Sequence, residues 1–386
     1  MRRFMRELRL VLSVAVLLVG LGEVSLRSCP SWLFPEEIRQ WLMAHHSLGH
    51  PALGAMERPH SPGVFIGRDF RVPYQTDSQG FYNVWPWPDT AEVVVLGDAM
   101  TLGYGVEAQQ AWPALVARAV APNRLLNLAL LDAGPRQYAR AYELFGTARH
   151  PKVLLVGLSL TDDLHDAVLF ARWQRGKAGG NYRVWRASGG ITGYWTNPFS
   201  LLHAWLARHS LLYQLGRVAL LDERTETQVV WLPGGQYLQL WPKRFQAVLA
   251  QTQPEHEAVG RVLDALAYLQ VIARAYGTQV IVVFLPSKEE VYLSPRGETP
   301  LDPGRALREG VQQRGMITLD LAPLLRQWGT KGEPLFYAVS PYLNEQGHAL
   351  VARAVLQHLA SVAYNYALRP WGTGRPGTPE ASLWTP

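Results

Sequence analysis

The chain contains a single cysteine, Cys29, among 386 residues, so no disulfide can form within one copy. Charged residues make up only 18% of the chain, and five of the 37 basic residues are lysine. Together with 48% apolar residues, this excludes a long disordered polyelectrolyte and indicates a globular protein with a substantial core. The formal charge of +6 is spread along the chain without a basic cluster or recognisable module, so no nucleic-acid partner is expected.

The N-terminus has the pattern of a membrane-targeting segment. Thirteen uncharged residues, Leu10–Gly22, follow a group of arginines at Arg2, Arg3, Arg6 and Arg9. This apolar core has signal-peptide length and is short for a full membrane span, but no A-x-A cleavage site follows it. We therefore expect residues 1–28 to be an uncleaved signal anchor. A cleaved signal peptide and lipidation at Cys29 are the alternatives.

The basic residues before the apolar core also predict the orientation in the membrane. Arginines are typical of the cytoplasmic side of a first membrane segment. The chain is therefore expected to cross the inner (cytoplasmic) membrane once. Its N-terminus would lie inside, and its globular part would lie on the periplasmic, extracytoplasmic side.

Short apolar runs predict five buried strands. They are Glu92–Leu96, Leu125–Leu128, Val153–Gly157, Gln279–Phe284 and Ile317–Leu319. Continuous apolar runs are typical of parallel strands that are covered on both faces. Helical patterns alternate with them at Trp112–Val120, Arg136–Thr147, Glu255–Tyr276, Arg305–Arg314 and Glu345–Tyr364. This alternation predicts a doubly wound α/β fold of three layers, flavodoxin-like, with a mostly parallel five-stranded sheet.

Interruptions of this alternation define the expected domains. Residues 29–90 are rich in Pro, Trp and His without a sustained period, and are expected to be a linker and lead-in. One domain is expected from residues 91–166 and 255–362, with an insertion at 167–254 that is too long for an ordinary connection. The insertion has an amphipathic stretch, Leu201–Leu221, and a strand pair around Val229–Leu232 and Tyr237–Trp241. Residues 363–386, rich in Pro and Gly, are expected to be a flexible tail.

The end of the first predicted strand forms a turn where a reactive side chain would be exposed. The apolar run ends at Gly97-Asp98, and a helix follows within a dozen residues. A chain that leaves a parallel sheet in this way presents its next side chain at the carboxyl edge, where α/β proteins bind ligands. That residue is Ala99, whose methyl group cannot attack a carbonyl.

Several short motifs, in order and placed after predicted strands, resemble the SGNH (GDSL-like) hydrolase family, in particular its membrane-anchored bacterial members. The motifs are Gly97-Asp98-Ala99-Met100-Thr101, Asn127-Leu128-Ala129, Gly134-Pro135-x-Gln137-Tyr138, Leu285-Pro286-Ser287-Lys288 and Asn344-x-x-Gly347-His348. The similarity covers roughly Glu92–Asp166 and Glu255–Leu359. It implies an SGNH-like fold and an esterase or O-acyltransferase ancestry, in some members directed at cell-surface polysaccharides.

The resemblance also implies five catalytic positions, and none is intact here. Ala99 stands at the nucleophilic serine, and Asp132 at the glycine of the oxyanion hole. Asp162 stands at the asparagine donor, while Ser340 and Tyr342 hold the positions of the acid and the base. An ionised aspartate only accepts hydrogen bonds and would oppose a developing negative charge. Replacement of the whole set predicts a pseudoenzyme and not a single engineered change.

Two histidines survive near this predicted edge. His348 lies one turn into the last predicted helix and is expected to pack there. His165 follows the third strand and is expected to be an exposed loop residue with no nucleophile to activate.

Three functional interpretations follow. The first is a catalytically inactive, membrane-tethered subunit that binds protein partners in an extracytoplasmic membrane complex. The second is a binding module for polysaccharide or acyl groups, with aromatic platforms among Trp85, Trp87, Trp112, Trp185 and Trp195. The third is an esterase or O-acyltransferase with altered chemistry. No cofactor is expected, unless Ca²⁺ or Mg²⁺ is held by a carboxylate cluster of Asp98, Asp132, Asp162 and Asp163.

Overall fold

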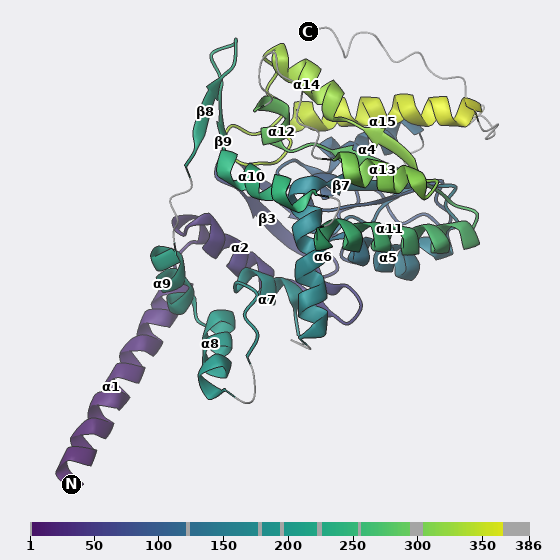
Figure 1. The fold of residues 1–386 in the computed structure, drawn as a ribbon. Coiled ribbons are helices and arrows are strands. Elements are labelled where there is room, and N and C mark those ends of the chain that lie inside the picture. The colour runs from purple at the N-terminus through teal and green to yellow at the C-terminus, as the bar shows by residue number, and fades with distance from the viewer. Residues whose placement is uncertain are drawn as a thin grey trace.

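A five-stranded parallel sheet forms the centre of the computed structural model, which describes residues 2–120, 124–176, 180–193, 197–221, 226–253, 256–293 and 304–365 (Figure 1). The strands are β5 (Val93–Leu96), β6 (Leu125–Asn127), β7 (Val153–Ser159), β10 (Gln279–Leu285) and β11 (Ile317–Asp320). Their order across the sheet is β11-β10-β7-β5-β6, so the chain starts near the middle and winds outward in both directions. All five strands were predicted, and the doubly wound α/β class is confirmed.

Alternate residues of each strand enter two separate cores. Val94 and Leu96 face α5 (Pro135–Ala141), α6 (Leu160–Arg175), α11 (Glu257–Ala275) and α13 (Arg305–Gln313). Val93 and Val95 face α4 (Trp112–Val120), α14 (Ala322–Thr330) and α15 (Glu345–Asn365). Figure 1 shows these two helix layers on either side of the sheet. Because both faces are buried, the strands carry no polar alternation.

The segment before the sheet is packed structure, so its prediction as a linker was wrong. It contains η1 (Ser31–Leu33), α2 (Glu36–Ala44), β1 (Leu48–His50), β2 (Gly54–Met56), β3 (Pro62–Ile66) and β4 (Arg71–Gln75). Trp41, Leu53 and Phe65 are buried in three different clusters. Apart from α2, which buries Ile38, Trp41 and Ala44, each of these short elements buries at most one side chain, so no sustained period of 2 or 3.6 residues is visible in the sequence.

The insertion folds into helices and one hairpin. It holds α7 (Tyr182–Ala187), α8 (Pro198–His209), α9 (Leu211–Leu221) and α10 (Pro242–Gln251). The strands β8 (Gln228–Trp231) and β9 (Tyr237–Leu240) pair antiparallel, as predicted. The amphipathic stretch predicted at Leu201–Leu221 is two helices, because the chain turns at Ser210 between α8 and α9.

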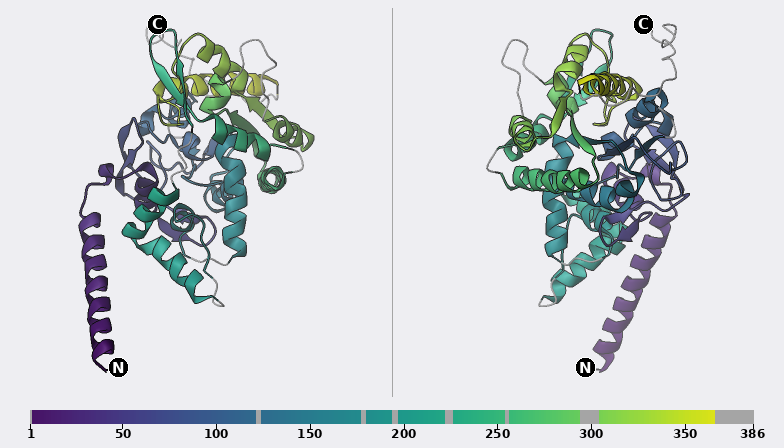
Figure 2. Two further views of the ribbon diagram at one scale, coloured as in Figure 1. Left: turned by 60° about the vertical axis from the view of Figure 1, so that its left-hand side comes forward. Right: turned by 90° about the vertical axis from the view of Figure 1, so that its right-hand side faces the viewer.

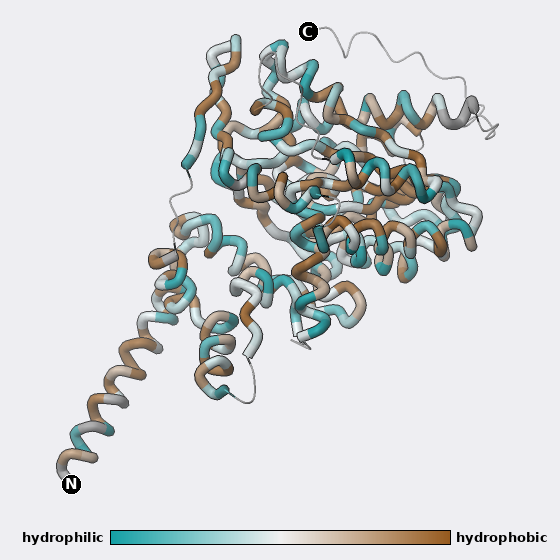
Figure 3. Tube along the Cα trace, in the orientation of Figure 1, coloured by the Kyte–Doolittle hydropathy of each residue, from teal (hydrophilic) through white to brown (hydrophobic). Residues whose placement is uncertain are grey.

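The chain begins with one long helix that projects from the body, α1 (Arg2–Arg27) (Figures 1 and 2). Within its segment Phe4–Arg27, an 18-residue stretch has a mean hydropathy of 2.0 and contains no buried residue. Figure 3 shows apolar residues along much of its length. By length and composition α1 could cross a membrane, although a signal sequence has the same properties. At the other end, residues 366–386 of the predicted tail lie outside the described residues.

Candidate functional site

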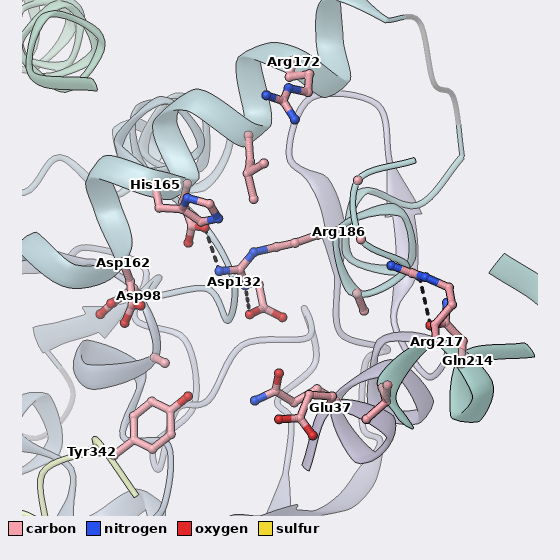
Figure 4. Close-up of a pocket in the computed structure, with 18 residues that line it drawn as sticks. Glu37, Asp98, Asp132, Asp162, His165, Arg172, Arg186, Gln214, Arg217 and Tyr342 are labelled. Atoms are coloured by element: carbon pink, nitrogen blue, oxygen red, sulfur yellow. Dashed lines mark hydrogen bonds and ion pairs between the residues drawn. The ribbon is translucent and has the colours of Figure 1, made fainter. Parts of the chain in front are cut away.

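A large cleft lies at the carboxyl edge of the sheet, with a volume of about 820 Å³ (Figure 4). Four of the five positions implied by the family resemblance line it: Ala99, Asp132, Asp162 and Tyr342. Most of the remaining wall comes from α6 and from the segments that flank the sheet domain, namely α2, α7 and α9. The structure thus brings the predicted positions together around one cavity and surrounds them with residues that sequence reasoning did not assign.

Asp98 and Ala99 form the turn that follows β5. The Asp98 carboxylate caps the short helix α3 (Ala99–Leu102), where its Oδ1 accepts the Met100 N–H at 3.0 Å. Its Oδ2 is buried without a hydrogen-bond partner among the described residues. Burial, together with the charge of Asp162, raises the pKa of Asp98 to about 7. Asp98 therefore positions the turn, and Ala99 presents only a methyl group to the cleft.

The raised pKa of Asp98 predicts a pH-dependent stability. A carboxyl whose folded-state pKa lies above its unfolded value stabilises the fold at low pH, and this contribution is lost as pH rises toward 7. Asp98→Asn keeps an acceptor for Met100 and removes the titration. The two proteins should have similar free energies of unfolding at pH 4. Between pH 4 and 8 the wild type should lose stability relative to the variant, because only the wild type has the titrating carboxyl. Urea unfolding in detergent across this pH range measures the difference in free energy of unfolding between the two proteins. A difference that does not change with pH would contradict the raised pKa of Asp98.

Asp132 occupies a backbone conformation that favours glycine. Its φ of 57° lies in the left-handed region, which aspartate tolerates better than most residues. This is the position that the family resemblance equates with an oxyanion-hole glycine, and the backbone geometry agrees with that alignment. The Asp132 side chain turns toward α7, where it forms ion pairs with Arg186 and, at 3.4 Å, with Arg183.

The two arginines of α7 connect a network of charges along the cleft. Arg183 also pairs with Glu57 and is almost fully buried. Arg186 also pairs with the buried carboxylate of Asp166, at 2.7 Å. Burial lowers the pKa of the Arg186 guanidinium, but the carboxylates of Asp166 and Asp132 outweigh it and raise the pKa well above its usual value. The residue at the position implied for the oxyanion hole therefore has its side chain in an ion pair with Arg186 (Figure 4).

The four aspartates proposed as a cation cluster do not act as one ligand set. Asp98 caps α3, and Asp132 is paired with the arginines of α7. Asp163 is fully buried, where it accepts the Tyr138 hydroxyl at 2.5 Å and the backbone N–H of Ser159 at 2.6 Å. Within the described part of the chain, no group of three or more His, Cys, Asp or Glu residues could hold a metal ion. The prediction of a four-carboxylate site was wrong, because three of these side chains already have other partners.

Ser340 lies behind the cleft and holds the loop that leads to α15. Its hydroxyl accepts the N–H of Arg68 at 3.2 Å, and its own N–H donates to Asp69 at 3.0 Å. Its carbonyl accepts from the ammonium of Lys288 at 3.0 Å. The residue is almost fully buried, so at the position implied for a catalytic acid it acts as a structural hydrogen-bonding group.

Lys288 is a fully buried lysine at the start of α12 (Lys288–Tyr292). Its ammonium donates to four consecutive backbone carbonyls at 3.0–3.2 Å, those of Tyr337, Ala338, Val339 and Ser340. The ammonium also lies 5.1 Å from the ring centroid of Trp241. Burial lowers the pKa of Lys288 to about 8, although Glu289 and Asp69 oppose the shift. This contact fixes the loop that carries Ser340 and Tyr342. It joins residues about 50 positions apart, so it could not be predicted from the local sequence.

Tyr342 and the two histidines complete the comparison with a hydrolytic site. Tyr342 packs edge-on against Tyr104, with ring centroids 4.8 Å apart, and its hydroxyl faces the cleft in Figure 4. Burial raises the pKa of Tyr342 well above its ordinary value, so it stays neutral at physiological pH. His348 is buried as expected, and its Nδ1 accepts the N–H of Trp112 at 3.3 Å. His165 is exposed, but it lies on helix α6 and lines the cleft instead of occupying a loop.

The four described tryptophans of the predicted set do not form aromatic platforms in the cleft. Trp112 and Trp185 are fully buried, and Trp87 donates its indole N–H to Asp77 at 2.6 Å. Trp85 is half-buried and packs against the core on the α4 side of the sheet. Trp195 lies outside the described residues. None of the four described tryptophans lines the cleft.

Solved structures of lipases and esterases are similar to this chain. They include a GDSL-like lipase from Bacteroides thetaiotaomicron, at 9% identity over 70% of this chain and 88% of that chain, with a TM-score of 0.33. A catalytic mutant of an acetylxylan esterase from Geobacillus stearothermophilus matches at 13% identity over 70% and 95%, with a TM-score of 0.37. The esterase EstA from Pseudoalteromonas sp. matches at 10% identity over 71% and 98%, with a TM-score of 0.38. No family model and no curated protein matches the chain.

The structure has a doubly wound three-layer α/β fold with a cleft at the carboxyl edge of its sheet, as predicted. Its sequence motifs, including the turn after β5, resemble those of the SGNH hydrolases.

Proposed function

We propose that the protein is a catalytically inactive SGNH-like domain, tethered to the inner membrane by α1, which serves as a structural or partner-binding subunit of an extracytoplasmic complex. The proposal rests mainly on the residues that line the cleft. Ala99 offers no nucleophile at the turn after β5, and the implied oxyanion-hole position holds Asp132, whose carboxylate is paired with Arg186.

The remaining groups supply no substitute for an ester-hydrolysing apparatus. Such chemistry needs a nucleophile, a base within hydrogen-bond reach and donors aimed at the oxyanion. Tyr342 is neutral and Ser340 is buried, and both hold structural contacts in the loop before α15. His348 is buried, and its Nδ1 accepts a hydrogen bond from the N–H of Trp112. Asp132, Ser340 and Tyr342, three of the five implied catalytic positions, therefore have ion-pairing or structural roles.

The size of the cleft favours one second candidate, a binding module for a glycan or an acyl group. A cavity of about 820 Å³ is within the range of small-molecule sites in proteins. Its wall contains carboxylates and arginines that could bond to sugar hydroxyls, including Glu37, Arg172 and Arg217. The polysaccharide would then be a ligand and not a substrate.

Purification of the tagged full-length protein from native membranes in mild detergent separates these two candidates. A stoichiometric complex with one or more proteins supports the subunit role. A monomer that is retained on immobilised polysaccharide supports the binding module and counts against the subunit role. Retention is compared with that of Arg217→Met/Glu37→Gln, a double variant altered only in the cleft wall.

Restoring the serine alone is expected to leave the protein inactive. Ala99→Ser places a hydroxyl at the turn after β5, but Tyr342, at the implied position of the base, is a neutral phenol that does not take its proton. A nucleophile without its base contributes little to turnover. With p-nitrophenyl acetate, the variant should show neither an acyl-enzyme burst nor steady turnover above the buffer rate. A burst in proportion to enzyme would reveal a base in the cleft, with His165 the first to test by replacement with Gln.

A further inference from the structure

The C-terminal end of α1 is bonded to the first turn of α9. Glu23 of α1 accepts the backbone N–H groups of Leu211 and Leu212 at 2.8 and 3.0 Å, and the Ser210 hydroxyl at 3.0 Å. These N–H groups have no partners within their own helix, so Glu23 supplies the cap that α9 lacks locally. The acidic residue that interrupts the apolar run of α1 therefore fixes α1 to the insertion.

Two further contacts hold the same junction. Arg27 donates to the carbonyl of His209 at 2.6 Å and pairs with Glu23 at 2.7 Å. Leu26 packs against the cluster that contains Leu211 and Trp41. The corner between α8 and α9 is thus held where α1 leaves the globular body (Figure 1).

One face of α8 is apolar and has no partner within the described residues. Phe199, Leu202 and Trp205 are 83%, 54% and 56% exposed, whereas Ala204 and Ala207 on the opposite face are buried. In all three views of Figures 1 and 2, the start of α8 extends toward the side of the molecule where the N-terminus of α1 lies. Figure 3 shows apolar residues on both helices on this side.

The surroundings of this face suit a lipid surface. Helices α8 and α9 contain no acidic residue between 198 and 221. Directly after α1, Trp32 and Leu33 are 57% and 55% exposed. Tryptophan is enriched at membrane–water interfaces, and the absence of carboxylates from these two helices avoids repulsion by anionic lipid headgroups.

We propose that the α8 face formed by Phe199, Leu202 and Trp205 contacts the outer leaflet of the same membrane that α1 crosses. This inference rests on α1 being a membrane span, as in the proposed function. The partner is the lipid bilayer, which the exposed apolar side chains enter by about 5–10 Å. Because α9 also supplies Gln214 and Arg217 to the cleft wall, the contact holds the cleft beside the membrane surface.

Site-directed spin labelling of the full-length protein in phospholipid nanodiscs tests this contact. Cys29 is the only cysteine, so Cys29→Ser gives a background for single labels. Labels are placed by Phe199→Cys and Trp205→Cys on α8, by Leu17→Cys within α1, and by Val271→Cys on α11. Val271 is a matched control, because it is exposed and apolar and belongs to α11, a helix that lies far from α1 (Figure 1). Collision with oxygen, relative to a water-soluble nickel complex, reports the depth of each label.

The three outcomes separate the α8 contact from the membrane span itself. The inference predicts oxygen-dominated collisions at Leu17 and Phe199, an intermediate value at Trp205 and nickel-dominated collisions at Val271. A deep Leu17 label with nickel-dominated labels on α8 would overturn the contact and leave the tether intact, as a protein partner or a second copy on this face would require. A nickel-dominated Leu17 label would overturn the tether, and with it this inference.

Discussion

Lys288→Met is expected to destabilise the folded protein by about 3 kcal/mol or more. Methionine fills a similar volume but cannot donate to the four carbonyls of residues 337–340 that share the Lys288 ammonium. Buried acceptors left without donors bear the full cost of their desolvation. The loop that holds Tyr342 should loosen as well. Urea unfolding in detergent measures the loss, and amide hydrogen exchange of residues 337–344 should become faster.

Lys331→Met is the matched control for this change. Lys331 is exposed on the same side of the sheet, and its ammonium lies 5.1 Å from the ring centroid of Trp328. Its replacement should cost less than about 1 kcal/mol. Equal losses for the two variants would contradict a structural role for the Lys288 contact.

Arg186→Met is expected to destabilise the protein by about 3–5 kcal/mol, as removal of one partner from a buried ion pair does. The change leaves the Asp166 carboxylate buried without its 2.7 Å partner. It also removes one of the two arginines that pair with Asp132. Burial already raises the pKa of Asp166 well above its usual value, and removal of Arg186 raises it further. The loss should therefore grow between pH 4 and neutral pH and be smallest near pH 4, where Asp166 is protonated in both proteins. Unfolding curves at the two pH values measure both effects.

Two further variants show whether the loss comes from an unpaired charge. Arg186→Met combined with Asp166→Asn should recover part of the stability, because the buried charge is then gone. Arg124→Met breaks an ion pair of Glu92 in which Arg124 is half exposed, and it should cost about 1 kcal/mol or less. If the double variant were less stable than Arg186→Met alone, the ion-pair explanation would fail.

The sheet could be predicted from sequence because its signals are local. Each strand is a continuous apolar run between turn residues, and its ends were placed within about two residues of those observed. The elements of residues 29–90 could not be predicted in this way. Trp41 is buried against Leu211, 170 positions away, and such a contact leaves no periodic pattern near either residue. The N-terminal segment was therefore interpreted as a linker although it forms part of the packed structure.

Only those residues of the candidate site that directly follow strands of the sheet could be placed from the sequence. Residues that follow neighbouring parallel strands meet at one edge, so Ala99, Asp132 and Asp162 were correctly expected to lie together. The partners of these residues could not be inferred. Arg186 reaches Asp132 from an insertion, across 54 positions. Its charge gave no signal, because 32 arginines are spread along the chain.

The esterase activity of the unmodified full-length protein tests the central claim most directly. The assay uses p-nitrophenyl acetate and butyrate with purified protein in detergent, and a variant with the family residues rebuilt is measured beside it. That variant carries Ala99→Ser, Asp132→Gly, Asp162→Asn, Ser340→Asp and Tyr342→His, with Asp69→Asn added because Asp69 would face the new carboxylate at 340. We predict no turnover by the unmodified protein above the buffer rate. Turnover that rises with its concentration and follows it through two purification steps would contradict the account.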